Sequence, residues 1–280
     1  MPIMHYDTLI TVAQVQSFTG PSVIVDCRFS LEQPDLGARL FSQRHIQGAH
    51  FLDLNKDLSG SLTASSGRHP LPPPEKLADS LRKLGLNSDS QLIAYDDRSS
   101  AFAARLWWLC RWLGHTKAAV LDGGLAAWLA VEGATASGMR ATPEKQGDFT
   151  AHVDNSLAAS AQDVQQRLQQ GDITLIDARG SERFSGKTEP LDAIAGHVPG
   201  AINLPFAANL QADGRFKSRK ELKARFSGGQ NTIHMCGSGV TACHNILASA
   251  YAGLEMPTLY PGSWSEWIRD PDRPVTQDLS

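Results

Sequence analysis

The sequence predicts an α/β protein of two tandem domains, each a mainly parallel sheet flanked by helices. Two observations lead to this prediction. The chain repeats a set of segments at a nearly constant offset, and short β-branched runs alternate with longer helical patterns. With 280 residues, the chain is long enough for two cores of ordinary size.

The first part of the repeat is a strand that ends in an acidic residue and is followed by a His-x-x-Gly segment. Val23–Arg28 precedes Arg44–Ala49, and Leu175–Arg179 precedes Gly196–Ala201 in the same way. The aspartate and the histidine are 19 residues apart in the first copy and 20 in the second. This agreement indicates two copies of one structural unit.

The second part of the repeat is an apolar strand that runs into a loop and an apolar helix. Leu92–Asp96 matches Thr232–Cys236, which makes Asp96 and Cys236 equivalent positions at an offset of 140 residues. Each half then closes on a segment rich in glycine and tryptophan, Asp122–Trp128 in the first and Pro261–Trp267 in the second.

Strands and helices are expected to alternate within each half. The clearest strand patterns are Val23–Asp26, Leu175–Asp177 and Asn231–Met235, and the clearest helical patterns are Glu75–Leu84 and Ala161–Gln170. Such alternation is typical of parallel strands with crossover helices. We expect domains at 1–136 and 156–280, joined by a linker at 137–155 that has no clear apolar period.

Composition excludes several classes of protein. The net charge of −3 and the isoelectric point near 6.3 provide no basic stripe for a nucleic acid. The N-terminus lacks a basic segment followed by an apolar run, and no apolar stretch approaches the roughly 18 residues of a membrane span. The four cysteines are sparse, which favours free thiols in a reducing cytoplasm.

The segment Met235–Cys243 is the most informative for chemistry. A strand runs into it, two glycines permit unusual backbone angles, and an apolar helix follows. A cysteine at such a turn faces backbone N–H groups and the positive end of a helix, which favours the thiolate over the thiol. The same groups could bind the anionic sulfur of a persulfide. The alternative interpretation is a buried core cysteine.

The loop Cys-Gly-Ser-Gly-Val-Thr resembles the active-site loop of the 3-mercaptopyruvate sulfurtransferases, a branch of the rhodanese superfamily. The resemblance covers nearly the whole chain and implies two rhodanese-like domains, of which the N-terminal one is inactive. It also implies that Cys236 accepts sulfur as a persulfide. The implied anion cradle consists of the amides of the next residues, namely Gly237, Gly239, Val240 and Thr241 together with Ser238.

Further roles are implied by the same resemblance. Ser238 would work with Asp53 and His69, which lie in the first half of the chain, to protonate the enolate that leaves when mercaptopyruvate loses its sulfur. Without the family match, Asp53 is interpreted as a turn or cap residue and His69 as a surface loop residue. No metal and no organic cofactor is implied.

The substrate anion needs a fixed cation, and arginine suits a carboxylate or a sulfonate. The resemblance implies that Arg183 supplies it, whereas Arg179 is interpreted as structural because Arg28 repeats it in the first half. The family has a second arginine after a Glu-Pro pair, but Leu191 follows Glu189-Pro190 here. This departure weakens the choice of 3-mercaptopyruvate over thiosulfate.

Other functions remain as alternatives. Thiosulfate:cyanide sulfurtransfer would use the same persulfide and the same acceptors, cyanide or a thiol. A non-catalytic rhodanese-like binding module or persulfide carrier is the alternative from another class. A cysteine phosphatase is excluded because Met235 and Ala242 stand where that chemistry needs a histidine and an arginine. The spacing of Cys243 and His244 matches no recognised metal site.

The remaining cysteines have simple structural interpretations. Cys243 lies about two helical turns after Cys236, so it could resolve an oxidised Cys236, but a packed helix residue is the simpler interpretation. Cys110 lies in a tryptophan-rich helix, and Cys27 lies at a strand end. Both are expected in the core of the first half.

Overall fold

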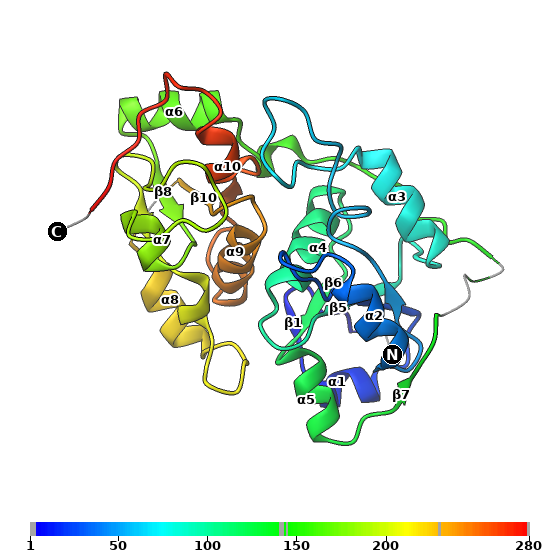
Figure 1. Cartoon of the computed structure of the whole chain (residues 1–280). Coiled ribbons are helices and arrows are strands. Elements are labelled where there is room, and N and C mark those ends of the chain that lie inside the picture. Colours follow the sequence, from blue (N-terminus) through cyan, green and yellow to red (C-terminus); the bar gives the residue numbers. More distant parts are fainter. Residues whose placement is uncertain (1–3, 140–142, 144, 229–230, 279–280) are drawn as a thin grey trace. The chain divides into compact units, whose positions relative to one another are not determined.

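The computed structural model describes residues 4–139, 143, 145–228 and 231–278 (Figure 1). The chain divides into two compact units. Unit 1 comprises Met1–Gly60, Pro72–Asp154 and Ala212–Phe216, and unit 2 comprises Ser61–Leu71, Asn155–Gln211 and Lys217–Ser280. Each unit therefore borrows a short segment from the part of the sequence that forms the other.

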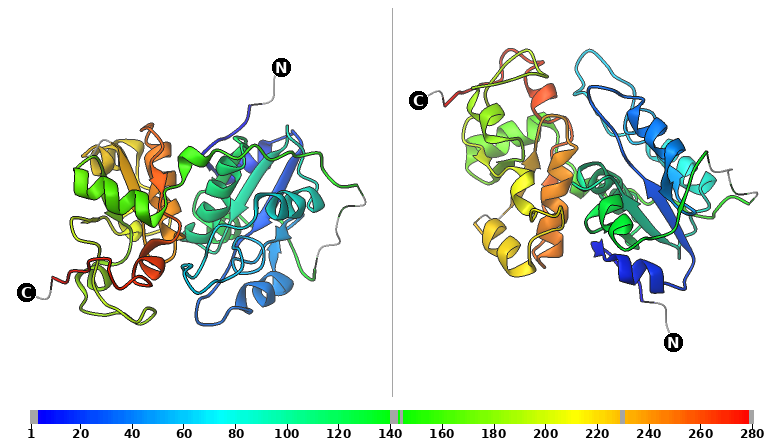
Figure 2. Two further views of the ribbon diagram at one scale, coloured as in Figure 1. Left: turned by 90° about the horizontal axis from the view of Figure 1, so that it is seen from above. Right: turned by 60° about the horizontal axis from the view of Figure 1, so that its bottom comes forward.

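Unit 1 is built on a parallel sheet with the strand order β1-β6-β5-β2-β4, and Figure 2 shows helices on both sides of it. Its strands are β1 (Leu9–Ile10), β2 (Ser22–Asp26), β4 (His50–Phe51), β5 (Gln91–Tyr95) and β6 (Ala118–Leu121). A separate antiparallel pair joins β3 (His45–Ile46) to β7 (Thr135–Ala136). All five residues of β5 are buried, as expected for a central strand with both faces covered.

The helices of unit 1 include one that is almost completely buried. They are α1 (Val12–Ser17), α2 (Leu36–Gln43), α3 (Pro74–Lys83), α4 (Ala101–Trp112) and α5 (Gly124–Ala130). The α4 helix is buried on almost every side, including Trp107, Trp108 and Cys110. The prediction that the tryptophan-rich segment forms a core helix is confirmed.

Unit 2 repeats the design with the parallel strand order β11-β10-β8-β9. Its strands are β8 (Thr174–Asp177), β9 (Ile202–Asn203), β10 (Thr232–Met235) and β11 (Thr258–Leu259). Its helices are α6 (Ala161–Gln170), α7 (Ser181–Ser185), α8 (Arg219–Phe226), α9 (Thr241–Tyr251) and α10 (Ser263–Trp267), with short 3-10 turns at Asn155–Leu157 and Phe206–Asn209.

The predicted repeat is present in atomic detail. Asp26 accepts hydrogen bonds from the backbone N–H and the guanidinium of Arg28, and Asp177 does the same for Arg179. His45 stacks on Phe41 in unit 1 as His197 stacks on Phe184 in unit 2. The aspartate–arginine pairs tie the ends of β2 and β8 to the following loops, which confirms that Arg179 is a structural residue.

Two segments without regular secondary structure belong to units that the predicted domain boundaries do not indicate. Residues 61–71, from the first half of the chain, belong to unit 2. In the predicted linker, the N–H groups of Gly147 and Phe149 donate to the carbonyls of Arg82 and Leu86 in unit 1. The compact units are discontinuous in sequence, so they do not test the domain boundaries that we predicted at 1–136 and 156–280. Those boundaries remain predictions.

Among the described residues, every helix is too short or too polar to cross a membrane. These residues also contain no cluster of three His, Cys, Asp or Glu side chains with the arrangement of a metal site.

Candidate active site

Cys236 directly follows the buried strand β10, and α9 begins five residues later. Its side chain is 2% exposed, and its N–H donates to Ser263 Oγ at 3.0 Å. Its carbonyl accepts from the N–H of Trp264, and the carbonyl of Gly237 accepts from the N–H of Ser265. The loop after β10 is thus held on one side by the Ser263–Ser265 turn.

The backbone N–H groups of the loop point to anion binding. Among the described residues, no protein acceptor is found for the N–H groups of Gly237, Ser238, Val240 and Thr241. They lie between a strand end and the N-terminus of an 11-residue helix, where the helix dipole is positive. Donors in this arrangement would stabilise a thiolate or a persulfide on Cys236.

Glycine is required at position 239 by the backbone. Gly239 has a φ of +76°, and a Cβ there would lie 2.3 Å from the carbonyl oxygen of Pro261. Any side chain would therefore force the loop away from the Pro261–Ser263 turn. Cys243 adds a second restraint, since its Sγ lies 3.2 Å from the carbonyl oxygen of Gly239. Cys243 is buried in α9, as its structural interpretation expects.

Ser238 and His69 lie together in unit 2. Ser238 Oγ and His69 Nδ1 are 2.7 Å apart, and both side chains are buried. The alternative interpretation of His69 as a surface loop residue is wrong. The histidine reaches the loop because residues 61–71 belong to unit 2, although we expected it to belong to the N-terminal domain.

Asp53 belongs to unit 1, where it organises a turn. Its Oδ1 accepts the N–H groups of Asn55 and Lys56, at 2.8 and 3.0 Å. Its own N–H donates to Asp57. These bonds match the turn-residue interpretation, and its participation with His69 and Ser238 stays a prediction.

Arg183 lies on α7, and its guanidinium lies close to the loop after β10. A Cβ placed on Gly237 would lie 3.3 Å from Arg183 Nη1 and 3.4 Å from Nη2. Glu189 holds the opposite edge of the guanidinium, with its Oε1 3.1 Å from Nε and 2.8 Å from Nη2. This places a fixed cation beside the residue that follows Cys236.

Two residues beside the loop were missed at the sequence level. Arg68 Nη2 would lie 3.0 Å from a Cβ on Gly237, and Arg68 Nη1 forms an ion pair with Asp192. Asp192 also pairs with Arg183 Nη2 at 3.2 Å. Burial raises the pKa of the Asp192 carboxyl, while Arg68 and Arg183 oppose that shift. The only local signal for Arg68 was its position next to His69.

The other cysteines of unit 1 are unsuited to nucleophilic chemistry. Burial raises the pKa of Cys110, and burial together with the nearby Asp26 raises the pKa of Cys27. Both side chains stay protonated and apolar at neutral pH.

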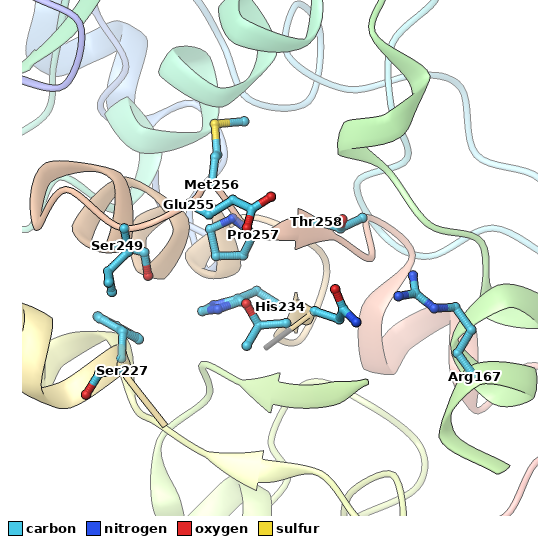
Figure 3. Close-up of a pocket in the computed structure, with 12 residues that line it drawn as sticks. Arg167, Ser227, His234, Ser249, Glu255, Met256, Pro257 and Thr258 are labelled. Carbon is cyan, nitrogen blue, oxygen red and sulfur yellow. The ribbon is translucent and has the colours of Figure 1, made fainter. Parts of the chain in front are cut away.

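A cavity in unit 2 lies away from this site. It measures about 460 Å³ and is lined by residues that include Arg167, Ser227, His234, Ser249 and Glu255 (Figure 3). None of its lining residues belongs to the loop from Cys236 to Thr241. This cavity is therefore separate from the hydrogen-bond donors that surround Cys236.

Comparison with known proteins supports the expected family. The rhodanese-like domain family matches residues 11–131 and 160–270. A probable 3-mercaptopyruvate sulfurtransferase of Pseudomonas aeruginosa is 47% identical over 95% of this chain and 97% of its own length. A putative thiosulfate sulfurtransferase of Mycobacterium tuberculosis is 39% identical, over 95% of this chain and 96% of its own length.

A solved structure gives the same result for the fold. The crystal structure of SseA from Escherichia coli, described as a 3-mercaptopyruvate sulfotransferase, superposes with a TM-score of 0.79 and 32% sequence identity. The match covers 93% of this chain and 100% of that one. The predicted tandem fold and the predicted enzyme class, sulfurtransferase, are confirmed. With two matching domains and relatives of nearly equal length, the chain belongs to the rhodanese-like family.

Proposed function

We propose that the protein transfers the sulfur of 3-mercaptopyruvate to a thiol or to cyanide through a persulfide on Cys236. The single observation that carries the proposal is the loop after β10, where Cys236 is followed by backbone N–H groups that have no protein acceptor among the described residues. The name of the relative at 47% identity supports 3-mercaptopyruvate as the donor.

In the first step, the Cys236 thiolate attacks the sulfur of the donor. A sulfur–sulfur bond forms, the carbon–sulfur bond breaks, and its electron pair remains on carbon as the enolate of pyruvate. The N–H groups of the loop favour the thiolate before this step and the anionic persulfide after it. No oxidant or reductant is needed, so the balance requires only one proton for the enolate carbon.

We assign that proton to the Ser238–His69 pair. The 2.7 Å contact allows the hydroxyl to give a proton to the enolate carbon while the histidine replaces it, which is general acid catalysis. Asp53 is the proposed third member, as the resemblance implies. The assignment of Asp53 is supported by the family pattern alone.

Arg183 is the proposed anion-binding residue. Its guanidinium lies beside Gly237 and is held from behind by Glu189, so its orientation is fixed before a substrate binds. In the second step the acceptor thiol or cyanide attacks the outer sulfur of the persulfide and restores the Cys236 thiolate. We propose no cofactor, metal, nucleic acid or membrane partner, and we place the reaction in the cytoplasm, where thiol acceptors are abundant.

Thiosulfate is the second candidate donor. Two observations favour it: Leu191 stands where the family has a second arginine, and one relative at 39% identity is named a putative thiosulfate sulfurtransferase. Sulfite would leave without needing a proton on carbon. The backbone donors and Arg183 suit either anion.

The deciding experiment is a comparison of kcat/KM for 3-mercaptopyruvate and thiosulfate with cyanide as the common acceptor. The proposal expects 3-mercaptopyruvate to exceed thiosulfate by at least about tenfold, because only that donor uses the Ser238–His69 pair. A higher kcat/KM for thiosulfate would select the second candidate. A protein that reacts with neither donor would be a binding module.

A further inference from the structure

Arg68 is fixed to unit 2 through its backbone. Its N–H donates to Ser265 Oγ at 3.0 Å, across 197 residues of sequence. The preceding Gly67 packs so closely that a Cβ there would lie 2.4 Å from the carbonyl oxygen of Gly262. Because the same turn also binds the carbonyls of Cys236 and Gly237, Arg68 and the catalytic loop share one support.

The guanidinium of Arg68 has unused hydrogen-bonding capacity beside the loop. Its Nη1 pairs with Asp192, whereas its Nη2 lies near Gly237 and has no protein acceptor among the described residues. Its Nε is buried and also has no hydrogen-bond acceptor among the residues that the structure describes. Its side chain is 25% exposed, so the group is reachable by a small solute.

Arg183 alone cannot offer a carboxylate two parallel donors from different nitrogens. Glu189 and Asp192 occupy its Nε and Nη2, which leaves Nη1 as the nitrogen with no acceptor among the described residues. A carboxylate has two oxygens and is bound best by two parallel N–H donors. A second guanidinium nitrogen near Gly237 would complete such a pair, and Arg68 Nη2 is placed there.

We propose that Arg68 and Arg183 together bind the carboxylate of the sulfur donor, one guanidinium to each oxygen. The proposal rests on the proposed function and supplies the second cation that Leu191 cannot provide. Both guanidiniums lie within 3.4 Å of the Cβ position of Gly237, so the bound carboxylate would lie one residue from the attacking sulfur. Proximity of this kind orients the donor for attack by Cys236.

Asp192 acts as a positioning residue in this arrangement. It contacts both arginines, and its side chain is 5% exposed. A carboxylate between two guanidiniums offsets their mutual repulsion and fixes the distance between them. Glu189 binds Arg183 from the far side, so each arginine turns a nitrogen without a protein partner toward Gly237.

The test compares Arg68→Gln and Arg68→Lys with Arg219→Gln, which removes an exposed arginine of α8 and serves as the matched control. Each variant is assayed with 3-mercaptopyruvate and with its methyl ester, which lacks the carboxylate charge. Thermal unfolding of each variant checks the fold.

With 3-mercaptopyruvate, Arg68→Gln should raise KM about 10- to 100-fold with little change in kcat, and Arg68→Lys should give an intermediate KM. With the methyl ester, the wild type and Arg68→Gln should agree within about twofold, because the charge that Arg68 binds is missing. Arg219→Gln should match the wild type with both donors.

Equal losses with the acid and the ester would show that Arg68 only supports the loop, and an unchanged KM would show that it does not bind the donor. Either result overturns the proposal. Failure of the proposed function itself looks different, because the wild type would then release no pyruvate from 3-mercaptopyruvate.

Discussion

The two equivalent loops of the molecule differ in what accepts their backbone N–H groups. In unit 1 the carboxylate of Asp96 accepts from the N–H groups of Ser100, Phe102 and Ala103, at 2.8, 3.0 and 3.3 Å. In unit 2, Cys236 stands at the equivalent position, and four N–H groups of its loop have no protein acceptor among the described residues. The first loop contains its own anion, and the second is arranged to receive one.

The scaffolds around these loops are nearly the same. Each unit ties an aspartate at a strand end to an arginine two residues later, and each stacks a histidine on a phenylalanine. Burial raises the pKa of Asp96 to about 6, although the three backbone bonds oppose the shift. Under the proposed function, the comparison teaches that one kind of loop can stabilise a fold or serve catalysis, depending on a single side chain at its first position.

We expect the largest effect on activity when Cys236 is replaced by aspartate, the residue at the equivalent position of unit 1. Cys236→Asp should reduce sulfur transfer from every donor to background, because a carboxylate would occupy the N–H groups and no nucleophilic sulfur would remain. The fold should persist, since unit 1 accepts aspartate at this position. Steady-state assays and circular dichroism measure both outcomes, with Cys236→Ser as the control. Activity in either variant would contradict the assignment of the nucleophile.

Ser238 has no counterpart in the first loop, where Arg98 stands at the corresponding position. Ser238→Ala should lower kcat/KM for 3-mercaptopyruvate about 100-fold, because the enolate loses its proton donor. The loss with thiosulfate should be much smaller, since sulfite needs no proton on carbon. Parallel assays of the two donors decide the matter. Equal losses would remove Ser238 from the acid role.

Asp96 should matter for stability and not for chemistry. Asp96→Ala leaves three N–H groups at the start of α4, two of them buried, without their acceptor, so the free energy of unfolding should fall by about 2 kcal/mol. Cys236→Ala should change it by less than about 1 kcal/mol, because no N–H group of the described residues donates to the Cys236 side chain. Urea titrations measure both variants. Similar losses in the two would mean that the loops do not differ as described.

The last difference concerns the strands that lead into the loops, and its effect appears only when the pH is changed. β10 carries His234 where β5 carries Ala94, and burial lowers the pKa of His234 from 6.5 to about 3. Between these values the unfolded chain binds a proton that the folded chain does not. The free energy of unfolding should therefore fall on acidification, by at most about 1.4 kcal/mol for each pH unit.

His234→Gln should remove this dependence. The difference in unfolding free energy between the wild type and the variant should shrink or reverse as the pH falls from 6 toward 4, by roughly 1 kcal/mol per unit. Taking the difference cancels the contribution of Asp96, which titrates in the same range with the opposite sign. A difference that is independent of pH would show that His234 titrates normally in the folded state.

The sequence was sufficient to predict the features that repeat or that belong to one element. The equivalence of Asp96 and Cys236, the strands before them and the structural role of Arg179 all follow from patterns within short segments, and the structure agrees. Arg68 and Asp192 could not be found in this way. Their positions depend on the irregular segment 61–71 packing on unit 2, a contact spanning 197 residues that no local period encodes.

The most direct test of the account is the location of sulfur after one reaction with 3-mercaptopyruvate. The account predicts that the peptide containing Cys236 gains the mass of one sulfur atom, that cyanide removes it, and that one pyruvate is released for each sulfur bound. Cys236→Ser should bind none. Pyruvate release with Cys236 unmodified, or sulfur found on Cys27, Cys110 or Cys243 instead, would contradict the account.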